Sequence, residues 1–276
     1  MIKVELTPPQ RHGSHGTPKV NGKWFTRPSN LPSFLEDRSG LSRWMQGLVA
    51  QGLALDDGLY QQARHMSPGG SGWTSLAEEA AKAAGSTEAR DYGTVLHTAT
   101  EAIDYGHEPT GTDAVKADAA AYKQACEDLG LEVLAAELFV ANEELEVAGT
   151  MDRLVVDAEG IARVLDIKTV KESADAEYAA RFSGFGWSMQ LSCYAHGSVY
   201  CGERGFLTWD EVGLRQPARN RAIVIGIPRG TGTYFAVDVD LIKGYELAKL
   251  ACQVREARRV KPASPMTGQT QIGGEE

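Results

Sequence analysis

The sequence has no long apolar run, and this absence excludes a membrane-spanning protein. Its longest apolar stretches are short segments such as 222–227, far below the roughly 20 residues that a helix needs to cross a bilayer. The N-terminus also lacks the basic, then apolar, then small-residue pattern of a signal peptide. We therefore expect a cytoplasmic protein with no membrane partner.

Cysteine is scarce, with four residues at positions 126, 193, 201 and 252 and no CxxC pair among them. A secreted disulfide scaffold has a higher cysteine density, and an iron–sulfur cluster would need ligands from distant segments. We expect buried, reduced thiols and no iron–sulfur cluster.

Positive charge is not in surplus either, because the formal net charge is −9. A protein that coats nucleic acid by bulk attraction needs a broad basic surface, which this composition disfavours. Basic residues gather only locally, at 215–221 and 255–261, and solvated helix or loop faces explain these clusters equally well. There is no GxxxxGK(S/T) phosphate-binding loop, so any DNA unwinding would have to come from a partner.

With 276 residues and 42% apolar content, the chain can bury a sizeable core. Residues 1–30 are rich in proline and glycine without any period, which predicts an extended or loosely packed arm. Residues 263–276 are polar and glycine-rich, which predicts a disordered tail. The intervening residues 31–262 are predicted to form one domain, with a helical N-terminal part at 31–90 and a core at 91–262.

Periodicity predicts an α/β (α+β) fold in which a small mixed β-sheet is flanked by helices. Three strands in series near the middle of the chain predict antiparallel neighbours. Helices are expected at 31–66, 75–84, 90–105, 113–129, 175–182, 187–200 and 241–259, and strands at 131–141, 147–157, 161–168, 221–227 and 233–239.

The central motif is Gly-Thr-Met-Asp152 followed at hairpin distance by Asp166-Ile-Lys168. Alternate side chains of a strand share a face, so Asp166 and Lys168 point together. A three-residue loop at 158–160, with Gly160 in the left-handed region, would pair residues whose numbers add up to 318. This register places Asp152 opposite Asp166.

Two carboxylates about 5 Å apart repel one another unless a cation lies between them. Mg²⁺ prefers carboxylate and carbonyl oxygens, so Asp152, Asp166 and the backbone carbonyl of Ile167 predict a Mg²⁺ or Mn²⁺ site. Lys168 could then orient or deprotonate an attacking water and offset charge on a phosphate. The alternative is a pair of strand-end aspartates with a surface lysine, but free charges are costly among such apolar strands.

Five sequence motifs occur in one order: Gly93-Thr-Val-Leu-His97, Glu137, Gly149-Thr-Met-Asp152, Asp166-Ile-Lys168 and Gln190-Leu-Ser-Cys-Tyr194. Together they resemble the PD-(D/E)XK nuclease superfamily, in particular its RecB-like exonuclease branch. The resemblance implies a restriction-endonuclease-like core, a metal held by His97, Asp152, Asp166 and the Ile167 carbonyl, and a catalytic Lys168.

The resemblance also implies a metal role for Glu137, although Glu143 or Glu144 could take its place if the strands are offset. Gln190 and Tyr194, four residues apart on one helix face, would position DNA or brace the site. Arg181 could contact phosphate, and a packing role is equally open.

The function implied is that of a Mg²⁺- or Mn²⁺-dependent DNA exonuclease acting on DNA with a single-stranded end. It is similar to stand-alone enzymes that bacteriophages use in recombination, replication or repair, which would place it in the host cytosol. A recombinase or helicase partner and a homo-oligomer are open expectations. A structure-specific endonuclease and a catalytically silent nucleic-acid-binding module are the alternatives.

Overall fold

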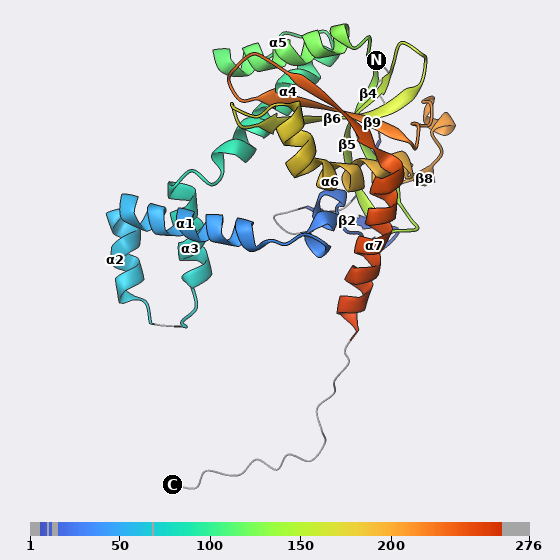
Figure 1. Ribbon diagram of the computed structural model, residues 1–276. Coiled ribbons are helices and arrows are strands. Elements are labelled where there is room, and N and C mark those ends of the chain that lie inside the picture. Colours follow the sequence, from blue (N-terminus) through green and yellow to red (C-terminus); the bar gives the residue numbers. More distant parts are fainter. Residues whose placement is uncertain (1–5, 10, 13–15, 68, 261–276) are drawn as a thin grey trace, which may run out of the picture.

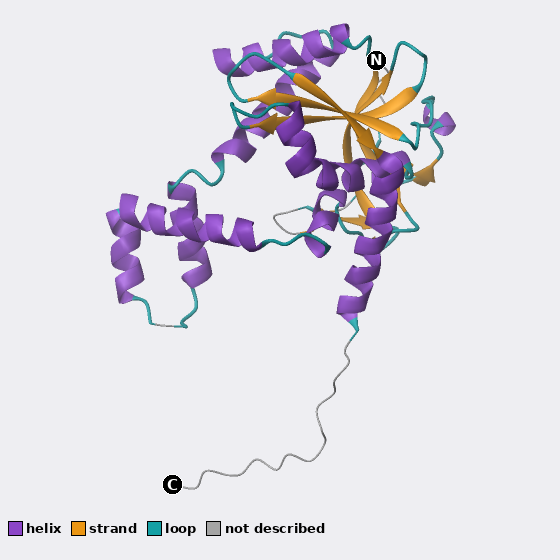
Figure 2. Ribbon diagram, in the orientation of Figure 1, coloured by secondary structure: helices purple, strands orange, loops and turns teal. Residues whose placement is uncertain are grey.

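The computed structural model describes residues 6–9, 11–12, 16–67 and 69–260. In this part of the chain, a seven-stranded mixed sheet lies between two layers of helices, and three further helices project to one side (Figures 1 and 2). The predicted fold class, a mixed sheet flanked by helices with a helical N-terminal part, is confirmed, although the sheet is larger than expected.

The sheet has the strand order β10-β9-β6-β5-β4-β7-β8. Its centre is antiparallel, as predicted for three strands in series, whereas β9 runs parallel to β6. The strands are β4 (Glu132–Asn142), β5 (Val147–Val156), β6 (Ala162–Val170), β7 (Ser198–Cys201), β8 (Gly205–Leu207), β9 (Arg221–Pro228) and β10 (Phe235–Asp240).

The β5–β6 hairpin has the predicted register, because its paired residues run from Val156↔Ala162 to Arg153↔Leu165. Each of these pairs adds up to 318. Gly160 has φ +78°, the left-handed conformation that the short turn requires and that glycine adopts without strain. One further step along this register would place Asp152 opposite Asp166, and Asp152 Oδ2 accepts a hydrogen bond of 3.0 Å from the backbone N–H of Ile167, the residue after Asp166.

Helices cover both faces of the sheet. Because successive side chains of a strand point to opposite faces, neighbouring residues pack against different helix layers. Leu165 and Ile167 pack under α4 (Glu88–Asp104) and α5 (Asp113–Asp128). Leu154 and Val164 pack on the opposite side with α6 (Ala176–Ala195), which in turn contacts α7 (Leu241–Arg259). Asp166 and Lys168 therefore belong to the α6 face.

Two expectations about the second half are wrong. A single helix, α6, spans the region where two helices were predicted, and it packs against η1 (Pro28–Phe34). A Cβ on Gly186 would lie 3.4 Å from Pro32 Cγ, an ordinary van der Waals distance, so this glycine does not interrupt the packing of the helix on η1. Residues 198–200, expected to end a helix, instead belong to strand β7, which pairs with β4 and buries Val199.

Of the two predicted alternatives for the N-terminal arm, extended or loosely packed, residues 16–30 show extended strands, but they are not loosely packed. Here β2 (Thr17–Val20) and β3 (Lys23–Trp24) form a small sheet with β1 (Arg11–His12), and Val20 and Phe25 are buried against the main sheet. Thr26 forms a parallel bridge with Val147 of β5. The predicted tail at 263–276 lies outside the described residues.

Helices α1 (Ser39–Leu55), α2 (Asp57–His65) and α3 (Trp73–Ala83) form a unit that projects from the sheet, here called the helical lobe, residues 39–83 (Figure 1). Within it, α1 packs mainly on α3 at Gly52, where a Cβ would lie 1.7 Å from the carbonyl oxygen of Ala80. Large apolar side chains on the N-terminal half of α1 are exposed, Trp44 by 53%.

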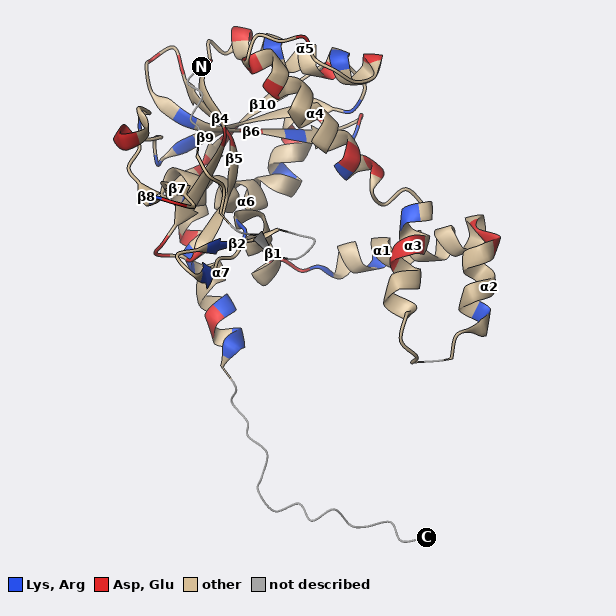
Figure 3. Cartoon of the chain, turned by 180° about the vertical axis from the view of Figure 1, so that it is seen from behind, with Lys and Arg blue, Asp and Glu red and all other residues tan. Residues whose placement is uncertain are grey.

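Basic residues lie at the C-terminal end of α7, with an acidic residue among them (Figure 3). Arg255 is buried there and donates to Thr26 Oγ1 and to the carbonyl of Leu145, both at 2.9 Å. It therefore ties α7 to residues 16–30, here called the N-terminal segment. All four cysteines are buried free thiols. Among the described residues, no helix combines the length and apolar character needed to cross a membrane.

Candidate active site

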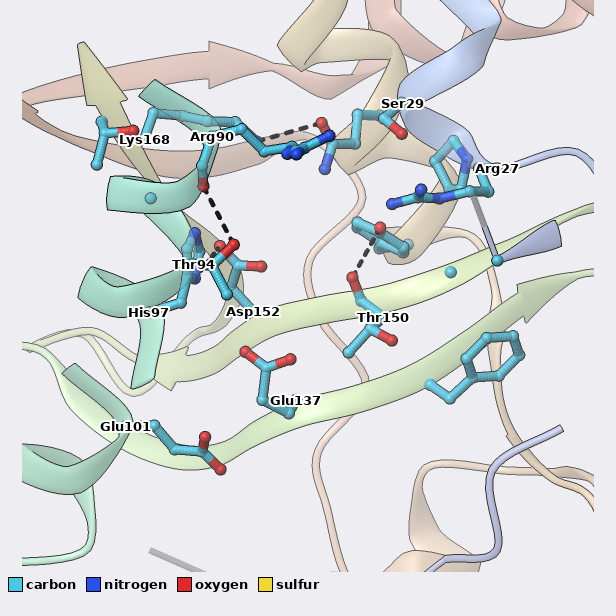
Figure 4. Close-up of a pocket in the computed structure, with 18 of the residues that line it drawn as sticks. Arg27, Ser29, Arg90, Thr94, His97, Glu101, Glu137, Thr150, Asp152 and Lys168 are labelled. Atoms are coloured by element: carbon cyan, nitrogen blue, oxygen red, sulfur yellow. Dashed lines mark hydrogen bonds and ion pairs between the residues drawn. The ribbon is translucent and has the colours of Figure 1, made fainter. Parts of the chain in front are cut away.

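A cavity of about 670 Å³ lies where α4, the strands β4 to β6, helix α6 and the N-terminal segment meet (Figure 4). One wall is α4, which contributes His97 and Glu101. The floor is formed by the strands, with Glu137 and Asp152. The opposite wall is formed by residues 27–29, from the segment that the sequence predicted to be an extended or loosely packed arm.

His97, Glu137 and Asp152 bring one ligand atom each to within 4.8 Å of one another. His97 Nδ1 lies 3.6 Å from Asp152 Oδ2. The same Asp152 oxygen accepts a hydrogen bond of 3.0 Å from the backbone N–H of Ile167 on β6. An imidazole and two carboxylates aimed at one point form a donor set that suits a divalent cation.

Glu137 stands out because its φ is +52° within a β-strand. A left-handed conformation costs energy for a residue with a Cβ, and such strain persists only where surrounding contacts hold it. Arg153 Nη1 donates to Glu137 Oε1 at 3.3 Å. Burial and the charge of Asp152 raise the pKa of the Glu137 carboxyl, and the Arg153 guanidinium opposes them. The alternatives Glu143 and Glu144 line a different hollow.

Asp166 and Lys168 form an ion pair on the α6 face, with Nζ 2.7 Å from Oδ2. Gln190 of α6 joins them, donating to Asp166 Oδ1 at 3.3 Å and accepting from Lys168 Nζ at 3.4 Å. Asp166 is 1% exposed, and burial raises its pKa to about 6 against the opposing charge of Lys168. Burial alone would lower the pKa of Lys168, but the charges of Asp166 and Asp152 raise it above its usual value.

Tyr194 braces the floor from α6, because its hydroxyl donates to the carbonyl of Thr150 at 2.8 Å. Gly149 makes room for this contact. A Cβ on Gly149 would lie 2.9 Å from Pro28 Cδ and 3.0 Å from Tyr194 Oη. The glycine before Thr-Met-Asp152 therefore serves close packing of the N-terminal segment and α6 against β5.

Arg153, which the sequence reasoning did not single out, is fully buried beneath the site. Its guanidinium donates to Asp104 of α4, to Thr100 Oγ1 and to the carbonyl of Asp152 at 2.8 Å. Burial raises the pKa of Asp104, while Arg153 lowers it. An arginine placed between Asp152 and the apolar Leu-Val-Val run was the available signal, since it must find a partner inside.

The cavity unites most of the predicted residues and adds others. His97, Glu137, Asp152, Lys168, Gln190 and Tyr194 all line it, with Asp166 beneath Lys168. The Ile167 side chain is buried under α4 and α5, and its carbonyl as a ligand stays a prediction. Arg181 is not among the lining residues and contacts the Phe182 ring, 5.3 Å away. The lining residues that the sequence reasoning missed include Arg27, Ser29, Arg90 and Thr94.

No protein-family model and no curated protein matches this chain. The site is described by its own geometry, which combines a three-donor group, an adjacent lysine–aspartate pair and an open cavity above both.

Proposed function

We propose that this protein is a metal-dependent nuclease that hydrolyses phosphodiester bonds at DNA ends. The observation that carries the proposal is the group of His97, Glu137 and Asp152 in one cavity with Lys168. The motif resemblance to RecB-like PD-(D/E)XK exonucleases supports DNA as substrate and an exonuclease as the activity. A role in phage recombination, replication or repair, together with a recombinase or helicase partner, belongs to the same proposal.

The donor set fits Mg²⁺ or Mn²⁺. Carboxylates with retained waters suit both Mg²⁺ and Mn²⁺, and His97 would add one nitrogen donor to them. Two acidic side chains on neighbouring strands lie close together, and a bound cation would offset their repulsion. Arg153 pairs with the Glu137 carboxylate but contacts Asp152 only at its backbone carbonyl. When bound, the metal would supply Lewis acidity and lower the pKa of a coordinated water.

Lys168 acts as a charged hydrogen-bond donor in this proposal. Its ion pair with Asp166 keeps the ammonium protonated, which disfavours the alternative role of general base. From the cavity wall it can offset negative charge that develops on a phosphate oxygen, and Gln190 fixes its position. Asp166 thereby serves first to place Lys168.

The test is incubation of end-labelled linear DNA and closed circular DNA, single- and double-stranded, with Mg²⁺, Mn²⁺ or chelator. Loss of linear DNA alone, only with metal, is the expected result. Cutting of circles would indicate the endonuclease alternative. Absence of metal-dependent cutting on every substrate would overturn the proposal, and DNA binding without cutting would favour the silent binding module.

Matched variants assign the activity to the site. Asp152→Asn and Lys168→Met should each lower cleavage by at least about a hundredfold, as expected for groups that act on the transition state. Asp238→Asn and Lys243→Met make the same chemical changes on β10 and α7, outside the cavity lining, and should leave cleavage unchanged. If the control variants lost as much cleavage activity as the site variants, the assignment of the activity to this cavity would be wrong.

A further inference from the structure

The mouth of the cavity carries positive charge above its acidic floor. Arg27 and Arg90 come from segments far apart in the sequence and both line the cavity. They reach into it from opposite walls and toward one another (Figure 4). Two guanidinium groups on opposite walls of one cavity can both donate to a single anion between them.

Arg27 projects from a fixed backbone. Its φ of −73° and ψ of 139° are extended, which is the conformation that the following Pro28 imposes. Pro28 is itself buried against Gly149, and Thr26 bridges to Val147. The position of Arg27 over the cavity is thus set by β5, the strand that also carries Asp152.

Arg90 lies in the first turn of α4, two turns before His97 on the same wall. Its guanidinium is 3.4 Å from Asp91, in a pair whose side chains are 73% and 61% exposed. Exposed pairs of this kind contribute little free energy, so Arg90 can exchange Asp91 for a stronger anion at low cost. An arginine on each wall, above the donor group, matches the fork geometry with which guanidinium groups bind phosphate.

We infer that Arg27 and Arg90 clamp one backbone phosphate of a single nucleic-acid strand and so position that strand over the His97, Glu137 and Asp152 group. The inference rests on the proposed function for the identity of the ligand and deepens it. Arg27 and Arg90 are positioning residues, distinct from the metal donors and from Lys168. The clamp also gives the N-terminal segment a function, because it forms the wall opposite α4.

The test measures binding of a fluorescein-labelled oligothymidylate by anisotropy, in chelator and over a series of salt concentrations. The proteins are the wild type, Arg27→Gln, Arg90→Gln, the double variant and Arg204→Gln, whose arginine lies in the β7–β8 turn away from the cavity. Circular dichroism verifies folding of each variant.

Each clamp variant should weaken binding about tenfold or more, as loss of a charge-assisted hydrogen bond does. Because both arginines hold one phosphate, the double variant should lose less affinity than the product of the single losses. For the double variant, the slope of log affinity against log salt concentration should differ from that of the wild type by about 0.7, the value for one phosphate on a single strand. Arg204→Gln should match the wild type.

Multiplicative losses with a slope change of about 1.4 would mean two separate phosphates and would overturn the shared clamp. Wild-type affinity in both single variants, or no binding by the wild type, would overturn it as well. Because chelator prevents metal-dependent cutting, the result is independent of catalysis. A clamp confirmed in a protein that never cuts would leave the inference standing and remove the proposed nuclease activity.

Discussion

At the scale of single residues, Gly149 is a position where an absent side chain shapes the site. We predict that Gly149→Ala destabilises the protein by about 1–3 kcal/mol, because its Cβ would press against Pro28 Cδ and Tyr194 Oη at 3.0 Å or less. Urea unfolding followed by circular dichroism measures the change. Gly47→Ala in α1 is the matched control: its Cβ meets nothing within 4 Å, and alanine favours helix, so stability should hold or rise. Equal losses in both variants would mean that close packing at Gly149 is unimportant.

Arg153 is the second residue on which the site depends. We predict that Arg153→Met costs about 3–5 kcal/mol, because it leaves Asp104 and Glu137 without their buried cation. Arg153→Lys should recover only part of this, since lysine lacks the fork that reaches both carboxylates. Thermal unfolding gives the loss.

Arg221→Met is the control for Arg153. Arg221 pairs with Asp238 at 3.1 Å, but both side chains are exposed, so the change should stay within about 0.5 kcal/mol. A stable Arg153→Met protein that retains the unfolding midpoint of the wild type would show that the buried network contributes nothing.

At the scale of elements, a histidine lies at the contact between α6 and α7. His196 ends α6 and stacks on Tyr245 of α7, with ring centroids 3.8 Å apart. Its Nδ1 lies 3.0 Å from the Ser192 carbonyl. Burial lowers the pKa of His196, as do the charges of Arg219 and Lys249, while the Ser192 carbonyl and Glu144 act in the opposite direction.

The sign of the pH dependence follows from this. A folded-state pKa below the ordinary value of about 6.5 means that the folded protein favours the neutral ring. Its stabilisation is present above that pH and is lost as pH falls through the lowered folded-state pKa. We predict that, as pH falls below about 6.5, the free energy of unfolding of the wild type decreases relative to that of His196→Phe. The phenylalanine ring keeps the stack on Tyr245 and does not titrate. Parallel pH profiles of the two proteins would contradict the prediction, and NMR titration of the imidazole locates the transition.

Elements with local determinants were predictable from the sequence. The β5–β6 register depends on a short turn with Gly160, and the face shared by Asp166 and Lys168 follows from strand alternation. Helix α6 packs against η1 and strand β7 pairs with β4, and periodicity within one segment contains neither contact. Tertiary packing overrides local preference at such positions.

The candidate site divides in the same way. Asp152, Asp166 and Lys168 follow from one hairpin, whereas His97, Glu137, Gln190 and Tyr194 were predicted only through the motif resemblance. Arg27 and Arg90 were missed because their meeting depends on how the N-terminal segment and α4 pack around the sheet. The sequence of either segment contains no pattern that predicts a contact with the other.

At the scale of the whole molecule, stability is unevenly distributed between the sheet core and the helical lobe. Among the described residues of the lobe, only Gly52, Leu76, Ala80 and Ala81 are buried. Every residue from 39 to 47 is exposed, including the apolar Leu41 and Trp44. Local opening costs least where few apolar contacts are broken.

We therefore predict that backbone amides of α1 and α2 exchange with deuterium well before those of β5, β6 and the second half of α6. Hydrogen exchange read by mass spectrometry at two protein concentrations tests this. The internal control is α5, which is a helix of similar length to α1 but packs on the sheet through buried Val115, Ala119 and Tyr122, so it should exchange slowly. Protection of α1 equal to that of α5 at both concentrations would contradict the prediction. Protection that rises with concentration would instead show that a second copy covers Leu41 and Trp44, because self-association alone depends on the amount of protein present.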